Sequence, residues 1–313
     1  GSMLRGAFGH AFRRLSCMTR AKTCNGCPLL VTCPYSLIFE TAANSQQVLA
    51  DSVQAPKPYS IEPPPHGYQR LQQGDPFGFA MVLYGHAAQQ LPLIILAWER
   101  ALERGLGSDQ QACKLVSVHM GNPDMPIYTP GSQIHLHPAT AAANSLDWSG
   151  RQQAILHFAT PLRLQRQGKV LGMRELDPRT LIVTLARRYQ MLTSAWQPNA
   201  PTLDFRQIGE LASQLQMETR LHWLDFERYS SRQQQTTPLG GLVGELQLTG
   251  NLEPLASLLE LGQTLHIGKE TTFGLGGYQL RHDWSIQPHR PNPASPANPT
   301  DPWANARTTG ATA

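Results

Sequence analysis

Apolar residues recur along the chain at two spacings, which predict a mixture of helices and strands. In residues 3–17 the large apolar side chains fall on one side of a helical projection and predict an amphipathic helix: Leu4, Phe8, Phe12 and Leu15. Asp177 and Pro178 suit the cap and first turn of a helix that runs to about Trp196. Further helices are predicted at 87–104, 204–215 and 253–261, and strands at 77–84, 115–120, 133–137, 154–164, 219–226, 241–249 and 275–284. The first of these strands (FGFAMVLY) is apolar enough to be buried on both faces, and the fourth is expected to break at Pro161.

The order of these elements predicts an α+β protein with two domains and a tail. From residue 149 to 285 the chain begins with a strand and helices and ends with two strands, a helix and a strand, which matches the split βαβ arrangement of a ferredoxin-like (RRM-like) fold. A first domain with the same fold and a Cys-rich loop after its first helix is predicted at 3–148. It starts at residue 3 because Gly1 and Ser2 are typical of residues left by cloning. Residues 286–313 are rich in Pro, Asn, Ala and Thr and are expected to be disordered.

Charge and composition point to a cytoplasmic protein with an anionic partner. The net charge is +4, and the cations comprise 21 arginines and five lysines. Arginine forks grip phosphate and stack on bases, which suits RNA, although a GC-rich genome would also produce this ratio. The longest apolar run falls short of the roughly 18 residues that a membrane span requires, and a signal peptide is not expected.

Four of the five cysteines are clustered with a spacing that suits a metal. They are Cys17, Cys24, Cys27 and Cys33. Four thiolates can enclose a structural Zn²⁺ or, as an alternative, hold an iron–sulfur cluster. Four free thiols in a loop would be the simpler interpretation. His135 and His137 would share one face of a strand, but surface histidines explain them as well.

Residues 266–277 (HIGKETTFGLGG) form the segment most suggestive of ligand binding. The glycines would let the backbone approach a ligand, and free amides there can hold phosphate oxygens. Charge would come from Lys269, hydroxyls from Thr271 and Thr272, and close approach from Gly268, Gly274 and Gly276. A tight helix-to-strand connection is the alternative explanation.

Several segments in the same order resemble one protein family. The segment at 266–277 resembles the glycine-rich loop of CRISPR repeat-processing endoribonucleases of the RAMP superfamily, with His266 replacing the first glycine. Residues 4–9 resemble the family's first helix, 24–35 the Cys-rich loop of one branch, 160–163 the start of the second domain, and 228–244 the strands before the loop. This resemblance implies two tandem ferredoxin-like domains and a hairpin of CRISPR repeat RNA as the partner.

The resemblance also implies a chemistry and its residues. The family cleaves the repeat without metal: the 2′-hydroxyl attacks the neighbouring phosphate, giving a 2′,3′-cyclic phosphate and a 5′-hydroxyl. Its catalytic histidine lies on or after the first helix, which here indicates His10, with Arg13 and Arg14 to stabilise charge. Some branches lack this histidine, and in that case Arg13, Arg14 and Lys269 would stabilise the charge. RNA contacts are expected from the glycine-rich loop and from two basic strips that contain Arg163, Arg166 and Lys169, and Arg228, Tyr229 and Arg232.

One departure from the family pattern and two alternative functions stay open. Family members usually carry a strand before the first helix, so either the start codon is assigned too late or the first domain lacks this strand. A non-catalytic RAMP subunit that binds guide RNA beside other CRISPR effector subunits would share the fold and the loop. A metal- or cluster-binding interaction module, working through its cysteines, is the third possibility.

Overall fold

Within the described residues, the first half of the chain contains two α-helices and two two-stranded sheets. The computed structural model describes residues 1–40, 55–64, 71–107, 109–121, 124–137, 147–197, 199–225, 227–230, 235–281 and 283, with backbone alone for 227–230 and 235–237. The elements of this half are α1 (Ser2–Ser16), a π turn (Ser36–Glu40), β1 (Tyr59–Glu62), β2 (Ala80–Leu83), a 3₁₀ turn (Gly85–Gln90), α2 (Leu91–Arg104), β3 (Val118–His119) and β4 (Pro126–Tyr128). Strand β1 pairs antiparallel with β2, and β3 with β4.

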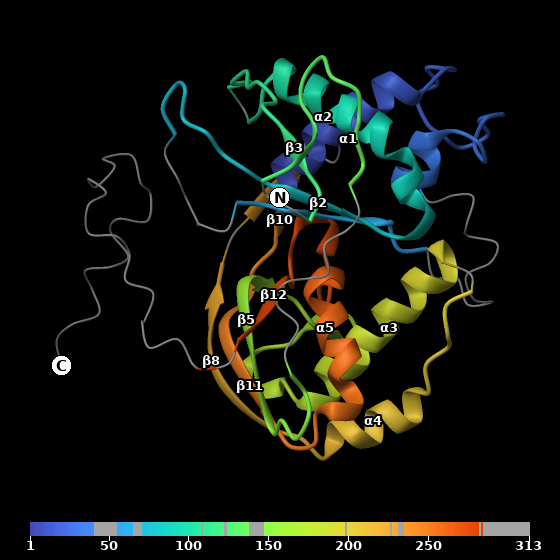
Figure 1. Cartoon of the computed structure of the whole chain (residues 1–313). Coiled ribbons are helices and arrows are strands. Elements are labelled where there is room, and N and C mark those ends of the chain that lie inside the picture. The colour runs from blue at the N-terminus through green and yellow to red at the C-terminus, as the bar shows by residue number, and fades with distance from the viewer. Residues whose placement is uncertain are drawn as a thin grey trace. The chain divides into compact units, whose positions relative to one another are not determined.

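The second half contains the larger sheet. Its elements are β5 (Gln153–Leu162), β6 (Gln165–Arg166), β7 (Lys169–Val170), a 3₁₀ turn (Met173–Glu175), α3 (Pro178–Trp196), α4 (Phe205–Ser213), β8 (Gln216–Leu224), β9 (Glu227–Ser230), β10 (Gln235–Pro238), β11 (Gly241–Thr249), a 3₁₀ turn (Glu253–Leu255), α5 (Ala256–Leu265), a 3₁₀ turn (Thr271–Phe273) and β12 (Tyr278–Arg281). Four of these strands form one antiparallel sheet in the order β12-β5-β11-β8. Helices α3 and α5 lie together on one face of it (Figure 1). This βαββαβ order with the fourth strand beside the first is the ferredoxin-like fold.

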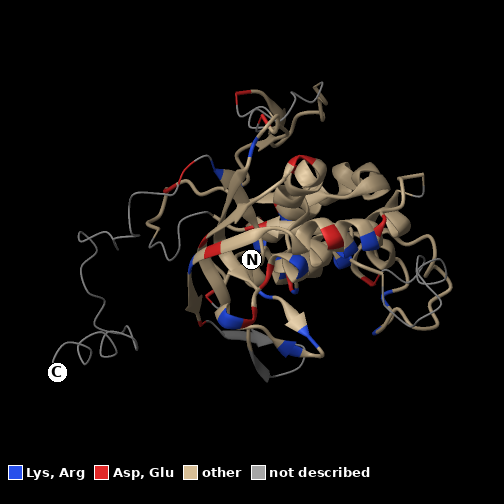
Figure 2. Ribbon diagram, turned by 90° about the horizontal axis from the view of Figure 1, so that it is seen from below, with Lys and Arg blue, Asp and Glu red and all other residues tan. Residues whose placement is uncertain are grey.

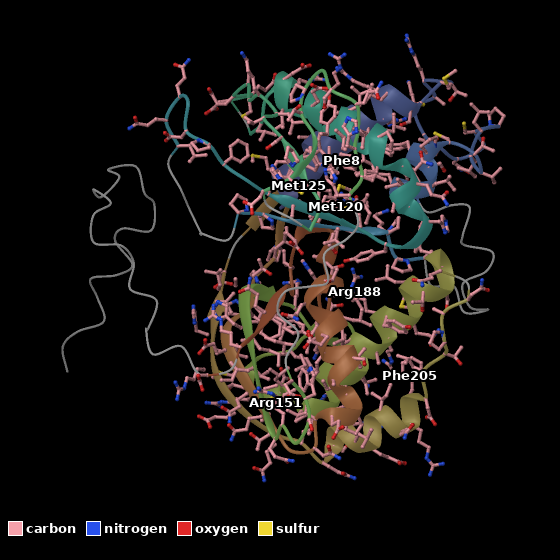
Figure 3. All side chains as sticks on the ribbon, viewed as in Figure 1. Phe8, Met120, Met125, Arg151, Arg188 and Phe205 are labelled. Atoms are coloured by element: carbon pink, nitrogen blue, oxygen red, sulfur yellow. The ribbon has the colours of Figure 1, made fainter. Side chains whose placement is uncertain are left out.

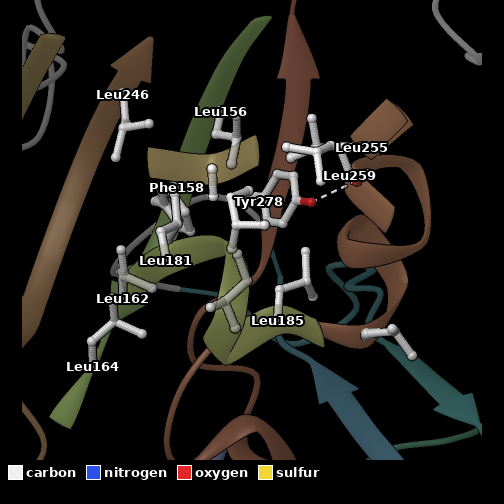
Figure 4. Packing of buried hydrophobic residues seen from close by; sticks show 14 of the residues in the cluster. Leu156, Phe158, Leu162, Leu164, Leu181, Leu185, Leu246, Leu255, Leu259 and Tyr278 are labelled. Carbon is white, nitrogen blue, oxygen red and sulfur yellow. Dashed lines mark hydrogen bonds between the residues drawn. The ribbon is translucent and has the colours of Figure 1, made fainter. Parts of the chain in front are cut away.

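The core of the second half lies between this sheet and its helices. Strand side chains Leu156, Phe158 and Leu246 pack against Leu181 and Leu185 of α3, all within 1 % of full burial (Figure 4). Each such side chain contributes about 1.5–3 kcal/mol relative to an exposed position. The buried Tyr278 hydroxyl donates to the carbonyl of Leu259 at 2.5 Å, which fixes β12 to α5.

An aromatic cluster fills the core of the first half. Phe8 stacks on Phe12 at 5.2 Å and on Trp98 of α2 at 5.0 Å between ring centroids. Tyr59 and Ile61 of β1 are fully buried beside them. Residues Gly1–His282 form one compact unit by their contacts, so the predicted boundary between 3–148 and 149–285 stays a prediction.

The predicted α+β class is confirmed, and several elements follow the sequence pattern closely. Helix α3 begins at Pro178, because the Asp177 carboxylate accepts from the Thr180 amide at 2.7 Å. Among the described residues, the helices are too short or too polar to cross a bilayer. The tail predicted at 286–313 lies outside the described residues.

Several strand predictions are wrong in detail; the strand predicted at 115–120, for example, is reduced to the two residues of β3. Residues 133–137 form no strand. The first predicted strand shrinks to β2, whose side chains are partly exposed instead of buried on both faces. Strand β5 continues through Pro161. The pairing with β11 shifts register between Leu242 and Gly244, so the ladder does not require the backbone N–H that proline lacks.

Candidate functional site

Helix α1 exposes His10 and Arg14 on the face opposite its buried phenylalanines. They are four residues apart, so their side chains lie on the same side of the helix. Arg13 has another role: it donates to the carbonyls of Ala21 and Lys22 at 2.6 and 2.8 Å and thereby holds the start of the Cys-rich loop. Of the three predicted catalytic residues, His10 and Arg14 are therefore the accessible ones.

The glycine-rich loop uses most of its amides to maintain its own conformation. The amides of Ile267, Lys269 and Gly276 donate at 2.9 Å to the carbonyls of Gly276, Arg163 and Pro161, respectively. The Gly274 amide also donates within the loop, to Thr271. Thr271, Gly274 and Gly276 are buried, whereas Gly268 and Thr272 are partly exposed and Lys269 is exposed. The accessible part of the loop is thus the tip at 268–270 together with Thr272.

Close backbone approaches within the protein explain the loop's glycines. Gly268, Gly274 and Gly276 have φ angles of 93°, 86° and 70°, which favour glycine. A methyl group on them would overlap the carbonyl oxygens of Arg163, Ile61 and Ile267, respectively. The prediction of a tight connection therefore accounts for these three residues, and contact between their amides and phosphate stays a prediction.

Contacts with the first half hold the loop on both sides. The Arg5 guanidinium of α1 lies over the Phe273 ring at 5.1 Å. His266 is 99 % buried, and its Nε2 lies 3.3 Å from Glu62 Oε1 of β1. Its φ is 63°, a conformation usual for glycine, which fits the place where the resemblance expects one. Sequence reasoning missed Glu62, because the partners are 204 residues apart.

A partly buried arginine supports the same junction. Arg188 of α3, labelled in Figure 3, donates through Nε to the carbonyl of Leu265 at the end of α5 and through Nη2 to Ser60 Oγ at 3.4 Å. Burial lowers the pKa of this guanidinium below its ordinary value, while Tyr84 partly offsets the effect. A guanidinium remains protonated at physiological pH all the same, so Arg188 is a permanent cation beside the loop.

The first predicted basic strip is largely engaged in structure. Arg163 donates to the Gly240 carbonyl at 2.6 Å, and Arg166 pairs with Asp177 at 2.8 Å. Burial would raise the pKa of Asp177, but hydrogen bonds from Thr180 and Arg166 lower it. Lys169, in the β6–β7 hairpin, is exposed. In the second strip, Arg228 and Tyr229 belong to β9 and Arg232 lies outside the described residues.

A row of charged residues crosses the face of the large sheet away from the helices. Arg220, Glu245 and His157 stand opposite one another on β8, β11 and β5. Glu245 is 95 % buried, and its Oε1 lies 3.2 Å from Arg281 Nη1 and 3.5 Å from His157 Nδ1. Basic and acidic positions are interspersed in the same way over other strands and helices (Figure 2). The sequence contained a signal for this row of charges: Glu245 lies in a largely buried strand, where a carboxylate without a partner would be destabilising.

The four clustered cysteines line one small cavity without forming a ligand set. Cys17 and Cys27 each approach Thr19 Oγ1, at 3.8 and 3.6 Å. Among the described residues no three Cys, His, Asp or Glu side chains converge as metal ligands. Burial would raise the pKa of the Cys17 thiol, but hydrogen bonds from Thr19 and Arg20 and the nearby Arg13 lower it. Burial raises the pKa of Cys24, and Glu40 adds to this effect.

Comparison with known families divides the chain into two matches. Residues 156–278 match the family described as CRISPR-associated endoribonuclease Cas6. Residues 1–140 match a separate family described as an N-terminal domain. The first match ends at Tyr278 and therefore includes the whole glycine-rich loop. No curated protein sequence matches the chain.

Solved structures resemble the chain at low sequence identity. A Cas6 product complex is 17% identical with a TM-score of 0.51, and the alignment covers 90% of this chain and 93% of that one. The same Thermus thermophilus Cas6, in another structure, is 16% identical with a TM-score of 0.45 and 90% coverage of both chains. A Cas6-related protein from Pyrococcus furiosus is 10% identical with a TM-score of 0.40 and the same coverage. The first of these likenesses supports the same fold across both halves.

Proposed function

Because the chain belongs, through residues 156–278, to the family of CRISPR-associated endoribonucleases Cas6, we propose that it cleaves CRISPR precursor RNA within the repeat. The observation that carries this proposal is the family match over the second half together with the solvent-exposed His10 and Arg14 on α1. The contact between Arg5 and Phe273 links α1 to the glycine-rich loop and supports a single site formed by both. The partners are then the repeat RNA, held as a hairpin after cleavage, and other CRISPR proteins.

The proposed reaction is an internal transfer at one phosphate. His10 takes the proton from a 2′-hydroxyl, and the 2′-oxygen attacks the adjacent phosphorus. The bond from phosphorus to the 5′-oxygen breaks, and a proton returns to that oxygen, which leaves a 2′,3′-cyclic phosphate and a 5′-hydroxyl. Arg14 and Lys269 stabilise the extra negative charge on the phosphorane. Each step uses groups of the protein and the RNA alone, so no cofactor is invoked for catalysis.

The cysteine loop is proposed to bind a structural zinc ion. Four cysteines line the same cavity, and four thiolates are a common donor set for tetrahedral Zn²⁺. The ion would have to draw the thiols together, because the described residues do not converge as ligands. Metal analysis of the purified protein should give one zinc per chain. Iron instead would favour a cluster, and no metal would leave four free thiols.

Cleavage of a matching repeat RNA in EDTA tests the main proposal. We predict that His10→Ala lowers the cleavage rate about 10²–10⁴-fold, as expected for loss of an acid–base group. His119→Ala, a change at another exposed histidine, should leave the rate unchanged. RNA with a single 2′-deoxy nucleotide at the cut should bind but not be cleaved. If the unmodified chain binds the repeat without cutting it, the chain is a non-catalytic RNA-binding subunit.

A further inference from the structure

A cleft runs between the C-terminal halves of α1 and α2. Its lining comes from one side of each helix, at matching spacings: Ala11, Arg14 and Leu15 from α1, and Arg100, Glu103 and Arg104 from α2. Residues three and four apart lie on one side of a helix, so both helices direct these side chains into the same space. Neither Arg100 nor Arg104 belongs to any motif discussed above.

The charge in this cleft is unbalanced. The cleft contains three guanidinium groups and one carboxylate, that of Glu103. Arg100 Nη1 forms an ion pair with Glu103 Oε2 at 3.1 Å. That pair is 61% and 52% exposed, so it contributes little to stability. Within the described residues, Arg14 and Arg104 form no ion pair. Two cations therefore remain without a carboxylate in a concave site.

Helix dipoles explain only part of this arrangement. Arg14 and Arg104 both stand in the last turn of their helices, where a cation gains roughly 0.3–1 kcal/mol. This effect accounts for one arginine at each helix end. It does not favour the convergence of three arginines from two helices, because their mutual repulsion opposes it. An anionic ligand would remove that repulsion.

The cleft begins one helical turn from His10. Four residues of α-helix rise about 6 Å, which separates His10 from Arg14 along the axis. A strand of RNA that placed one phosphate at His10 would therefore carry the neighbouring phosphates past Arg14 toward α2. The planar guanidinium fork suits two oxygens of one phosphate.

We propose that the cleft between α1 and α2 binds the RNA backbone beside the cut, with Arg100 and Arg104 as phosphate-binding residues. The proposal rests on the proposed function, since it assigns the ligand as the same RNA. Glu103 limits the affinity by holding Arg100 and by repelling phosphate. The cleft thus extends the reaction site from the loop and α1 onto α2.

Salt-dependent RNA binding tests this proposal. The double variant Arg100→Gln, Arg104→Gln should lower affinity for single-stranded repeat RNA about tenfold at low salt. The slope of log affinity against log salt should fall by about 0.7 for each phosphate that the variant no longer neutralises. The matched control is Arg206→Gln on α4, an exposed arginine paired with Glu210, which should change neither quantity beyond its small effect on net charge.

Glu103→Gln provides a test that misfolding cannot imitate. Removing this carboxylate should raise RNA affinity several-fold, because Arg100 is released and a repulsive charge is removed. Equal affinities and slopes for the double variant and Arg206→Gln, with Glu103→Gln unchanged, would overturn the cleft proposal while the parent chain still cleaves RNA. A parent chain that neither binds nor cleaves the repeat would overturn the proposed function and the cleft together.

Discussion

Replacing Gly276 by alanine should destabilise the protein because two independent costs coincide there. Its φ of 70° places an L-residue in the left-handed region, which costs about 1–2 kcal/mol. The added methyl group would also overlap the carbonyl of Ile267, whose amide donates to the Gly276 carbonyl at 2.9 Å. Overpacking of this kind costs about 1–3 kcal/mol. Together the free energy of unfolding should fall by about 2–5 kcal/mol.

Gly150 offers a matched control within the same chain. Its φ is 66°, but within the described residues nothing lies within 4 Å of a methyl group placed there. Gly150→Ala should therefore carry only the conformational cost, about 1–2 kcal/mol. Thermal unfolding is a suitable assay, since each kcal/mol corresponds to roughly 1.5–2 °C in a chain of 313 residues.

The comparison of the two variants decides the reasoning. Gly276→Ala should melt several degrees below Gly150→Ala. If both melt at the same temperature, the close approach between Gly276 and Ile267 contributes nothing, and the loop is freer than its hydrogen bonds indicate. In that event the loop amides become better candidates for phosphate binding.

Two further changes probe the second half. Asp177→Ala should lower stability by about 0.5–2 kcal/mol in denaturant unfolding at pH 7, because the cap of α3 is removed. The pKa of Asp177 is lowered from its ordinary 3.8, so the stability that its carboxylate contributes is present above that pH and disappears as pH falls through the pKa of Asp177 in the folded state. A stability difference between the native chain and Asp177→Ala that stays undiminished in acid would contradict this. Tyr278→Phe should cost about 0.5–1.5 kcal/mol at neutral pH through loss of the bond to Leu259. Burial raises the pKa of Tyr278, so the native chain loses stability as pH rises from the pKa of this tyrosine in the unfolded state toward its pKa in the folded state. If Tyr278→Phe loses as much stability at alkaline pH as the native chain, Tyr278 is not the group responsible.

Local signals in the sequence predicted the fold well. The cap at Asp177 and the alternation in 241–249 act between near neighbours, so α3 and β11 could be located without tertiary information. The strand prediction for 133–137 was wrong because a strand also needs a pairing partner, which a local pattern does not specify. A short alternating pattern is compatible with a strand, but whether a strand forms depends on pairing with a neighbouring segment.

The candidate site was less predictable because its contacts are distant in sequence. The placement of His10 and Arg14 on one face of α1 follows from helical spacing, whereas Glu62 reaches His266 only through the fold. Glycines give the same sequence signal whether a ligand or the chain's own backbone approaches them. For Gly274 and Gly276 the approaching atoms belong to Ile61 and Ile267, which no local pattern could reveal.

The contacts of Gly274 and His266 with β1 bear on how this protein could be recombined with its relatives. A chimera that takes only the second half from one parent would separate the loop from the strand at 59–62 that shapes it. Designers who wish to exchange RNA preference should therefore move that strand as well. Natural exchange between genes would face the same requirement, so these two distant segments are expected to be inherited as a set.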